Sequence, residues 1–271
     1  MKFTNISLKK YALRPKISYI RATSNPKGIC SACGNDDTYE KATIINDDLA
    51  RIWGLDKATR QSFDERESMF CKQCRCSFRL RQLAEAITYI YSDKHVLKDA
   101  IKQGDFDNLS IAEINSCGTL HEIIKHSGAI YSEYGSENPS VPHEDITKLS
   151  YKNNSFDMVL NSDTLEHVPD IKKALKEVRR VLKKDGFHIF TIPVVWWRKT
   201  KQKASLLRNE ISHHSVPSFH GAGEPDYLVF YEFGYDMINI IEDCGFEVKC
   251  YGLNLLNSSD TSGVFITRRK G

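Results

Sequence analysis

From residue 109 onward, the apolar positions alternate between short strand-like runs and stretches with helical spacing. Such alternation predicts βαβ units and a largely parallel sheet with helices on both faces, that is, a doubly wound α/β fold. The predicted strands are 111–115, 129–134, 156–160, 187–192, 247–251 and 264–267. The predicted helices between them are 120–126, 171–183 and 235–244.

Punctuating residues set the expected ends of these elements. Asp170 is the predicted N-cap of helix 171–183, and Asp185-Gly186 is its predicted stop. Upstream, apolar residues at helical spacing predict a helix over 79–91, and a shorter one over 95–103 ends before Gly104. Residues 194–226 show no clean periodicity and are rich in His, Ser, Lys and Pro, which predicts an irregular insertion.

Composition supports a soluble, folded chain. With 271 residues and 41% hydrophobic residues, the chain can bury a sizeable core, which excludes low-complexity disorder, collagen and coiled coil. No apolar run approaches the roughly 20 residues needed to span a bilayer. The net charge of +3 is too small to imply a polyanionic partner, but residues 1–29 hold seven cations and no acid and form a predicted basic arm.

Four of the eight cysteines form two CxxC pairs, Cys30/Cys33 and Cys71/Cys74. Two such knuckles supply the four thiolates of a structural Zn²⁺ site, and Gly34 allows a sharp turn after the first knuckle. Cys76 is a possible substitute for Cys74. Without a secretory h-region, the cysteines favour a reducing, cytoplasmic setting, although the basic N-terminus shares its composition with mitochondrial transit peptides.

The segment 155–170 reads SFDMVLNSDTLEHVPD and is followed by Glu177, Arg180-Val181-Leu182 and Gly186 at fixed spacing. It closely resembles class I S-adenosylmethionine-dependent methyltransferases over about residues 109–192. This resemblance implies a Rossmann-like, seven-stranded sheet and S-adenosylmethionine as cofactor. Together with the cysteine pairs, Ser132-Glu133-Tyr134 and His220-Gly221 resemble bacterial methyltransferases of surface-polysaccharide gene clusters.

The cofactor site is expected at the carboxyl ends of the strands. Glu133 ends the second strand, 20 residues after Glu113, at the position where an acid binds ribose hydroxyls. The resemblance places Asp145 at the adenine amine and places Asn161 and Ser162 beside the methionine. The family's glycine-rich loop keeps only one glycine here, Gly118. Asn115 can partly replace a glycine, because asparagine tolerates left-handed backbone angles. The full set of cofactor candidates is Glu113, Asn115, Gly118, Glu133, Tyr134, Asp145, Ile146, Asn161 and Ser162.

Methyl transfer to a hydroxyl needs a base, and the acceptor needs a binding surface. The candidate catalytic residues are His167, His220, His214 and Asp163. Trp197 and Tyr231 could stack a sugar or base, and Arg198 and Arg208 could hold a phosphate or carboxylate.

These features predict three parts: a basic arm (1–29), a zinc module with a linker helix (30–91) and a methyltransferase domain (92–271) with a substrate-binding insertion (194–234). The expected function is methylation of a hydroxyl or amine of a small molecule, such as a sugar, nucleotide-sugar or glycan-related phosphate. Two alternatives stay open. One is an RNA methyltransferase, with Arg75, Arg79 and Arg81 on phosphates. The other is a non-catalytic adaptor.

Overall fold

A computed structural model describes residues 19–20, 28–36, 39–220, 227–254, 257 and 259–271. One mixed sheet forms its centre, with strand order β1-β15-β16-β7-β6-β4-β5. β5, β4, β6 and β7 are parallel neighbours, whereas β16 is antiparallel to both β7 and β15. The strands are β1 (Tyr19–Ile20), β15 (Phe246–Tyr251), β16 (Val264–Arg269), β7 (Leu182–Thr191), β6 (Phe156–Ser162), β4 (Ile111–Ile114) and β5 (Ile130–Ser132).

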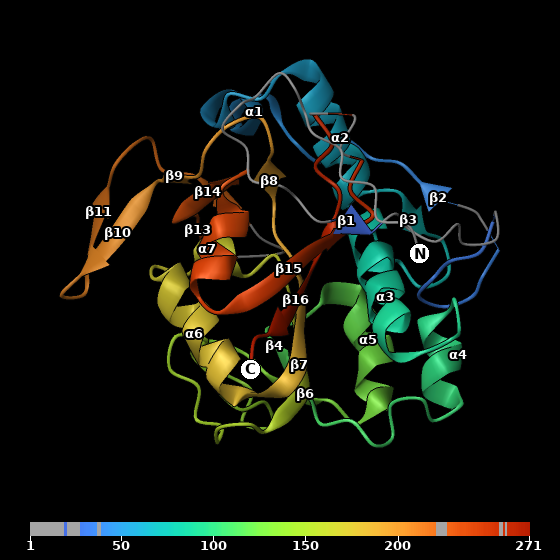
Figure 1. Cartoon of the computed structure of the whole chain (residues 1–271). Coiled ribbons are helices and arrows are strands. Elements are labelled where there is room, and N and C mark those ends of the chain that lie inside the picture. Colours follow the sequence, from blue (N-terminus) through green and yellow to red (C-terminus); the bar gives the residue numbers. More distant parts are fainter. Residues whose placement is uncertain (1–18, 21–27, 37–38, 221–226, 255–256, 258) are drawn as a thin grey trace.

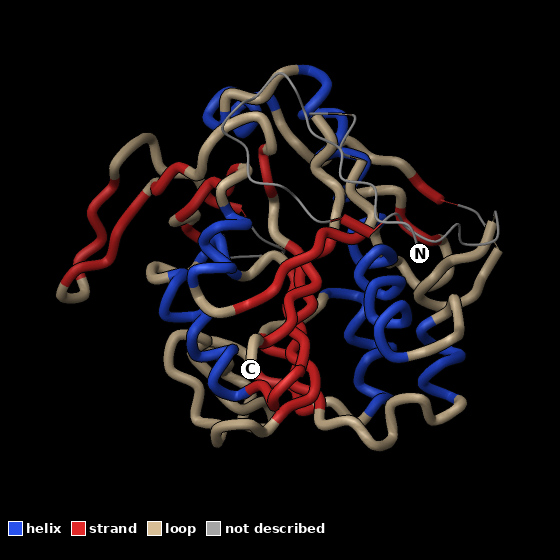
Figure 2. Tube along the Cα trace, viewed as in Figure 1, coloured by secondary structure: helices blue, strands red, loops and turns tan. Residues whose placement is uncertain are grey.

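Helices cover both faces of this sheet, as Figures 1 and 2 show. α6 (Ile171–Val181) and α7 (Met237–Asp243) lie on one face. The other face carries α3 (Phe78–Tyr91), α4 (Leu97–Lys102) and α5 (His121–Ile124), with the short 3-10 turns Gly118–Leu120 and Lys125–Ser127 around α5. The α/β fold predicted from the sequence is therefore confirmed.

Each strand sends alternate side chains to the two layers, as the period of two in a strand requires. In β6, Val159 packs in the core under α6 and α7, whereas Met158 and Leu160 pack in the core under α3, α4 and α5. Both cores consist of fully buried aliphatic and aromatic side chains. The sheet is thus held from both sides.

The second core also reaches the cysteine pairs. Leu83 and Ile87 of α3 share a cluster with Cys30 and Cys71 as well as with Ile189 of the sheet. α3 begins at its N-cap Ser77, directly after the second cysteine pair, and its contacts extend to β7 and β16. One helix therefore belongs to both the cysteine module and the sheet.

The cysteine module contains two helices that the sequence pattern did not reveal, α1 (Asp47–Trp53) and α2 (Lys57–Glu67). Asn46 and Asp56 cap them by accepting from backbone N–H groups three residues on. A short pair, β2 (Tyr39–Glu40) with β3 (Phe70–Cys71), closes the segment. The helices share a small core with the beginning of the insertion, where Phe63 and Trp53 meet Val195.

Asp185-Gly186 was wrong as a helix stop. α6 ends at Val181, and β7 begins at the next residue and runs through both positions. The pairing of β6 with β7 shifts register between Phe156 and Met158, and Asp185 has a φ of 63°. A Cβ on Gly186 would lie 3.0–3.1 Å from three backbone oxygens, so the pair serves a bulge inside a strand.

The insertion is built from short strands rather than irregular loop. They are β8 (Val194–Val195), β9 (Lys201–Gln202), β10 (Ala204–Leu207), β11 (Glu210–His213), β12 (Phe219–His220), β13 (Tyr227–Leu228) and β14 (Tyr231–Gly234). β10 and β11 form a hairpin that projects from the body, and β12 pairs with β13 beside the sheet's end (Figure 1). Strands of two to four residues are too short to show a period in the sequence.

Most of the predicted basic arm lies outside the described residues. Tyr19 and Ile20 alone of its first 27 residues are described, as an edge strand parallel to β15. None of the described helices has the length and apolar character that crossing a membrane requires.

His188 gives the folded chain a specific acid sensitivity. Its ring is fully buried, stacks on Phe190 and interacts through Nε2 with Asn161 Oδ1 at 3.1 Å. Burial lowers the pKa of His188 from 6.5 to about 3. Below pH 6.5, His188 therefore binds a proton in the unfolded chain but stays neutral in the folded chain. The unfolding free energy falls by up to about 1.4 kcal/mol per pH unit in this range.

We expect the unfolding free energy from urea titrations to drop between pH 7 and pH 5.5 by about 1 kcal/mol more in the unaltered protein than in His188→Gln. Glutamine hydrogen-bonds Asn161 but does not titrate. Equal drops in the two proteins would contradict a neutral His188.

Candidate functional site

The two cysteine pairs come together as predicted. The Sγ atoms of Cys30, Cys33, Cys71 and Cys74 all lie within 4.8 Å of one another. Cys30 Sγ is 3.7 Å from Cys74 Sγ, and Cys33 Sγ is 3.7 Å from Cys71 Sγ. A tetrahedral zinc with 2.3 Å bonds to sulfur requires an edge of about 3.8 Å between sulfurs, so this quartet has the size of a zinc shell.

The protonation of the quartet depends on whether a metal is bound. The hydrogen bond with Cys74 and burial raise the pKa of Cys30, so the metal-free thiol stays protonated. Four thiols this close together ionise together only when a metal neutralises them. Cys76 lies outside the quartet, where its sulfur accepts from the Thr119 hydroxyl at 3.5 Å.

The loop after β4 keeps a glycine-like backbone although an asparagine stands in it. Asn115 has a φ of 59°, its N–H donates to the Ser132 carbonyl, and its Oδ1 accepts from the Tyr134 N–H, both at 2.8 Å. The fully buried Glu113 carboxylate accepts from the Cys117 N–H at 2.8 Å and contacts His121 Nδ1 at 2.6 Å. Asn115 therefore ties the ends of β4 and β5 together, while Glu113 supports the loop from inside.

Two features of the structure favour a glycine at position 118. It has a φ of 58°, and a Cβ there would lie 3.3 Å from Leu80 Cδ1 of α3. α3 therefore packs closely against this loop. Because α3 begins in the cysteine module, the shape of the loop depends on that module.

Beside this loop, Glu133 follows β5 and accepts a hydrogen bond from the Tyr131 hydroxyl. Its backbone pairs with the segment around His143, and the Glu144 N–H donates to its carbonyl at 3.1 Å. Asp145 Oδ1 accepts from Thr147 in the same segment. The structure thus brings Asn115, Glu133 and Asp145 to one edge of the sheet, and the neighbouring Tyr134 side chain is 62% exposed.

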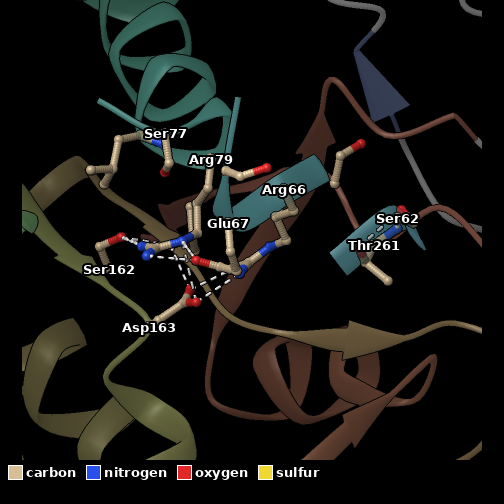
Figure 3. A network of polar contacts seen from close by, with 12 residues as sticks. Ser62, Arg66, Glu67, Ser77, Arg79, Ser162, Asp163 and Thr261 are labelled. Carbon is tan, nitrogen blue, oxygen red and sulfur yellow. Dashed lines mark hydrogen bonds and ion pairs between the residues drawn. The ribbon is translucent and has the colours of Figure 1, made fainter. Parts of the chain in front are cut away.

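At the end of β6, two arginines of the cysteine module meet the strand (Figure 3). Arg66, only 1% exposed, donates both guanidinium NH groups to the Asp163 carboxylate at 2.7 Å. Arg79 of α3 contacts Ser162 Oγ, Glu67 and, at 3.3 Å, Asp163. Asp163 also accepts from the Thr191 hydroxyl at 2.8 Å. The network fixes α2 and α3 against the carboxyl ends of β6 and β7.

Asp163 is ionised in this setting. Burial by itself would raise its pKa, but the charges of Arg66 and Arg79 outweigh burial and hold the pKa of Asp163 well below its usual range. A carboxylate held so firmly by two arginines is a weak proton acceptor. Its backbone φ of 46° is one that few non-glycine residues adopt.

Two histidines of the candidate set lie together next to this network. His167 ends the 3-10 turn Leu165–His167 after β6, and His220 ends β12, with ring centroids 4.9 Å apart. Burial lowers the pKa of His167, and burial together with His167 lowers the pKa of His220 to about 4. Both rings are neutral at physiological pH. Glu166 lies close to both histidines and is fully buried. Burial, followed by the charge of Asp163, raises the pKa of Glu166.

The remaining candidates lie elsewhere or in the interior. His214 is exposed on the projecting insertion, where its Nε2 lies 3.1 Å from Ser205 Oγ, and Arg208 stands in the turn between β10 and β11. Asn161 is fully buried against His188. The others make internal contacts: Arg198 with Glu232, Trp197 with Thr59, Tyr231 with the Pro169 carbonyl, and Ile146 in the core.

The sequence reading did not assign Arg66, Glu67 or Glu166 to the site. No local pattern marks Arg66, because its partner Asp163 lies 97 residues away. The arginines named for the RNA alternative all have partners within the chain. Arg75 forms a half-exposed pair with Glu40, Arg79 joins the network, and the Arg81 guanidinium lies 3.7 Å from the centroid of the Tyr39 ring.

Comparison with known proteins agrees with this geometry. Residues 112–190, from β4 to β7, match the family model described as a methyltransferase domain. This stretch carries Asn115, Glu133 and the turn with Glu166 and His167. The match supports the methyltransferase resemblance that the sequence predicted, over nearly the same part of the chain.

Individual relatives are distant. An uncharacterised protein of Methanocaldococcus jannaschii is 29% identical over 42% of this chain and 50% of its own, so the chain spans about half the length of that relative. Two solved structures that resemble the chain are S-adenosylmethionine-dependent methyltransferases from Mesorhizobium loti and Methanosarcina mazei. They are 13% and 18% identical, cover 59% and 60% of this chain and 91% and 92% of their own, and give TM-scores of 0.35 and 0.37.

The network at the end of β6 predicts a large cost for one substitution. Asp163→Asn removes the carboxylate that accepts from both terminal NH groups of the buried Arg66 and leaves only Glu67 to compensate its charge, and we expect the unfolding free energy to fall by about 3–5 kcal/mol. Denaturant titration measures this. Asp185→Asn is the matched control, because Asp185 also has a positive φ and pairs with Arg268, but in an exposed position. It should change stability by less than about 1 kcal/mol. Similar losses in both variants would contradict the role given to the buried pair.

Proposed function

We propose that the protein binds S-adenosylmethionine at the carboxyl ends of β4, β5 and β6 and transfers its methyl group to a hydroxyl or amine of a small molecule. The observation that carries this is the edge where Asn115, in a left-handed conformation, is tied to the strand end that presents Glu133. A parallel sheet binds nucleotides at this place. The methyltransferase-domain match covers the same edge.

In this proposal each side chain has a limited task. Glu133 accepts hydrogen bonds from the ribose hydroxyls, and Asp145 accepts one from the adenine amine. The exposed ring of Tyr134 lies beside them. Ser162, held by Arg79, borders the methionine end. The cofactor, once bound, supplies an electrophilic methyl group on sulfur, and the protein aligns it with the acceptor.

The acceptor side is assigned to His167 and His220. The neutral ring of His167, next to β6, can receive the proton of an acceptor hydroxyl. His220 is the weaker base of the two, because its pKa is lowered to about 4, and its task is to contact the acceptor beside His167. Asp163 is unsuited because two arginines lower its basicity, and His214 lies on the projecting insertion. Sugars, nucleotide-sugars and glycan-related phosphates are the first acceptors to screen. Arg208 lies in the same projecting hairpin as His214, and Arg198 pairs with the buried Glu232, so we assign neither of them a contact with the acceptor.

The four cysteines are proposed to hold one structural Zn²⁺. Four thiolates fill a tetrahedral shell, so this metal orders the chain and takes no part in the reaction. Because α3 begins beside the quartet and carries Arg79 and Leu80 to the site, the zinc supports the loop and the network at the sheet's edge.

Calorimetric titration with S-adenosylmethionine and S-adenosylhomocysteine tests the cofactor site. We expect micromolar affinity and a loss of about tenfold or more in Glu133→Gln, because a charged hydrogen-bond acceptor is removed. Glu137→Gln is the control, since Glu137 is exposed in the following loop. Absence of binding to the unaltered protein would refute the cofactor site, and equal affinity in both variants would refute its placement at Glu133.

Metal analysis tests the zinc site. Cys74→Ser should contain about one zinc per chain less than the unaltered protein and should unfold at lower temperature. Cys76→Ser, changed two residues away and outside the quartet, should keep its zinc. A loss of zinc in Cys76→Ser alone would transfer the fourth ligand to Cys76.

A further inference from the structure

A second group of metal-type ligands lies beside the sheet's edge, apart from the cysteines. Glu166, His167 and His220 each offer a ligand atom, and these atoms lie within 4.8 Å of one another. Glu166 and His167 are neighbours in the 3-10 turn after β6, while His220 comes from β12 of the insertion. Two segments more than fifty residues apart therefore converge on one small volume.

The carboxylate in this group is buried without support. Glu166 is fully buried, and neither of its oxygens has a hydrogen-bond partner among the described residues. His167 Nε2 lies 3.8 Å from Glu166 Oε1, which is longer than a hydrogen bond. His220 Nε2 is likewise buried and without a partner in the described part of the chain. Buried polar atoms of this kind call for a ligand.

The orientation of His167 completes the pattern. Its Nδ1 lies 3.0 Å from the Leu228 carbonyl oxygen, so the N–H is at Nδ1 and donates to that oxygen. The lone pair at Nε2 is then directed toward the Glu166 side. Metal-binding histidines typically fix their tautomer in this way, by donating the other N–H to a carbonyl or carboxylate.

The arginines nearby do not satisfy Glu166. Arg66 and Arg79 each pair with Glu67 and with Asp163. Among the described residues, no hydrogen bond joins either arginine to a Glu166 oxygen.

We propose that Glu166, His167 Nε2 and His220 Nε2 bind a divalent transition-metal cation. Two imidazoles and one carboxylate suit ions such as Zn²⁺, Fe²⁺, Mn²⁺ and Co²⁺ better than Mg²⁺ or Ca²⁺, which prefer oxygen ligands. Three protein ligands leave coordination positions for water or for an oxygen of another molecule. The cation site stands independently of methyl transfer.

Its consequence for the reaction rests on the proposed function. A histidine that binds a cation through Nε2 cannot also take a proton there. With the metal present, the acceptor hydroxyl would lose its proton because the cation lowers its pKa, and the two histidines would act as ligands instead of bases.

Cobalt(II) chloride is the probe for this site, applied to the full-length protein with zinc already in the cysteine quartet. We expect one Co²⁺ per chain, with visible d–d absorption and without the strong thiolate-to-metal band of a cysteine site. Glu166→Gln and His220→Gln should each weaken binding about 100-fold or more, since even outer partners of metal ligands contribute 10–100-fold. His214→Gln, which changes an exposed histidine of the same insertion, should bind Co²⁺ as the unaltered protein does.

Several results would overturn the cation site. One is the absence of a cobalt spectrum in the unaltered protein, and another is an affinity in Glu166→Gln and His220→Gln equal to that of the unaltered protein. A thiolate band would place the ion at the cysteines. Calorimetry with S-adenosylmethionine on the same samples separates the two proposals, because cofactor binding without cobalt refutes only the cation site, and cobalt binding without cofactor refutes only the proposed function.

Discussion

The buried ion pair between Arg66 and Asp163 is the contact on which the arrangement of the site depends. A guanidinium with 1% exposure cannot lose its counter-charge without a large penalty, so α2 must stay against the end of β6. Through Arg79, the same carboxylate holds α3, and through Thr191 it holds the end of β7. The positions of Ser162, Glu166 and His167 all follow from this one anchored residue.

The cysteine module therefore does more than bind a metal. Leu80 of α3 lies over Gly118, and Arg79 reaches Ser162, so the module contributes directly to the shape of the cofactor edge. The sequence predicted a domain boundary after residue 91, but the core continues across this position, because α3 packs with the sheet strands in one cluster. Metal, loop and strand ends form a single mechanical unit.

Local chemistry made some of this predictable. The CxxC spacing identified the four cysteines, and the tolerance of asparagine for left-handed angles anticipated the conformation of Asn115. The period of the apolar residues gave α3, α6 and the central strands. The Asp185-Gly186 pair misled because the same residues end a helix or form a bulge, and only the pairing of β7 with β6 decides between them.

What the sequence could not reveal are partners that only the fold brings together. Arg66 pairs with Asp163, which lies 97 residues further along the chain. His220 contacts His167, and the strands between them in the insertion are too short to show a period in the sequence. Glu166 looked like an ordinary motif residue, and its lack of partners became visible only once burial was known. Burial and long-range pairing are properties of the whole chain, so local patterns do not encode them.

The double attachment of α3 also bears on the order of folding. One of its partners is β16 with the turn before it, where Gln82 Oε1 accepts from the Gly263 N–H 181 residues away. Such distant contacts are slow to form. During synthesis, the part of α3 that packs against β16 stays uncovered until residues 263–269 have left the ribosome. A nascent chain would therefore expose part of this apolar helix for a long stretch of translation, and chaperones that shield such surfaces would have that time in which to bind it.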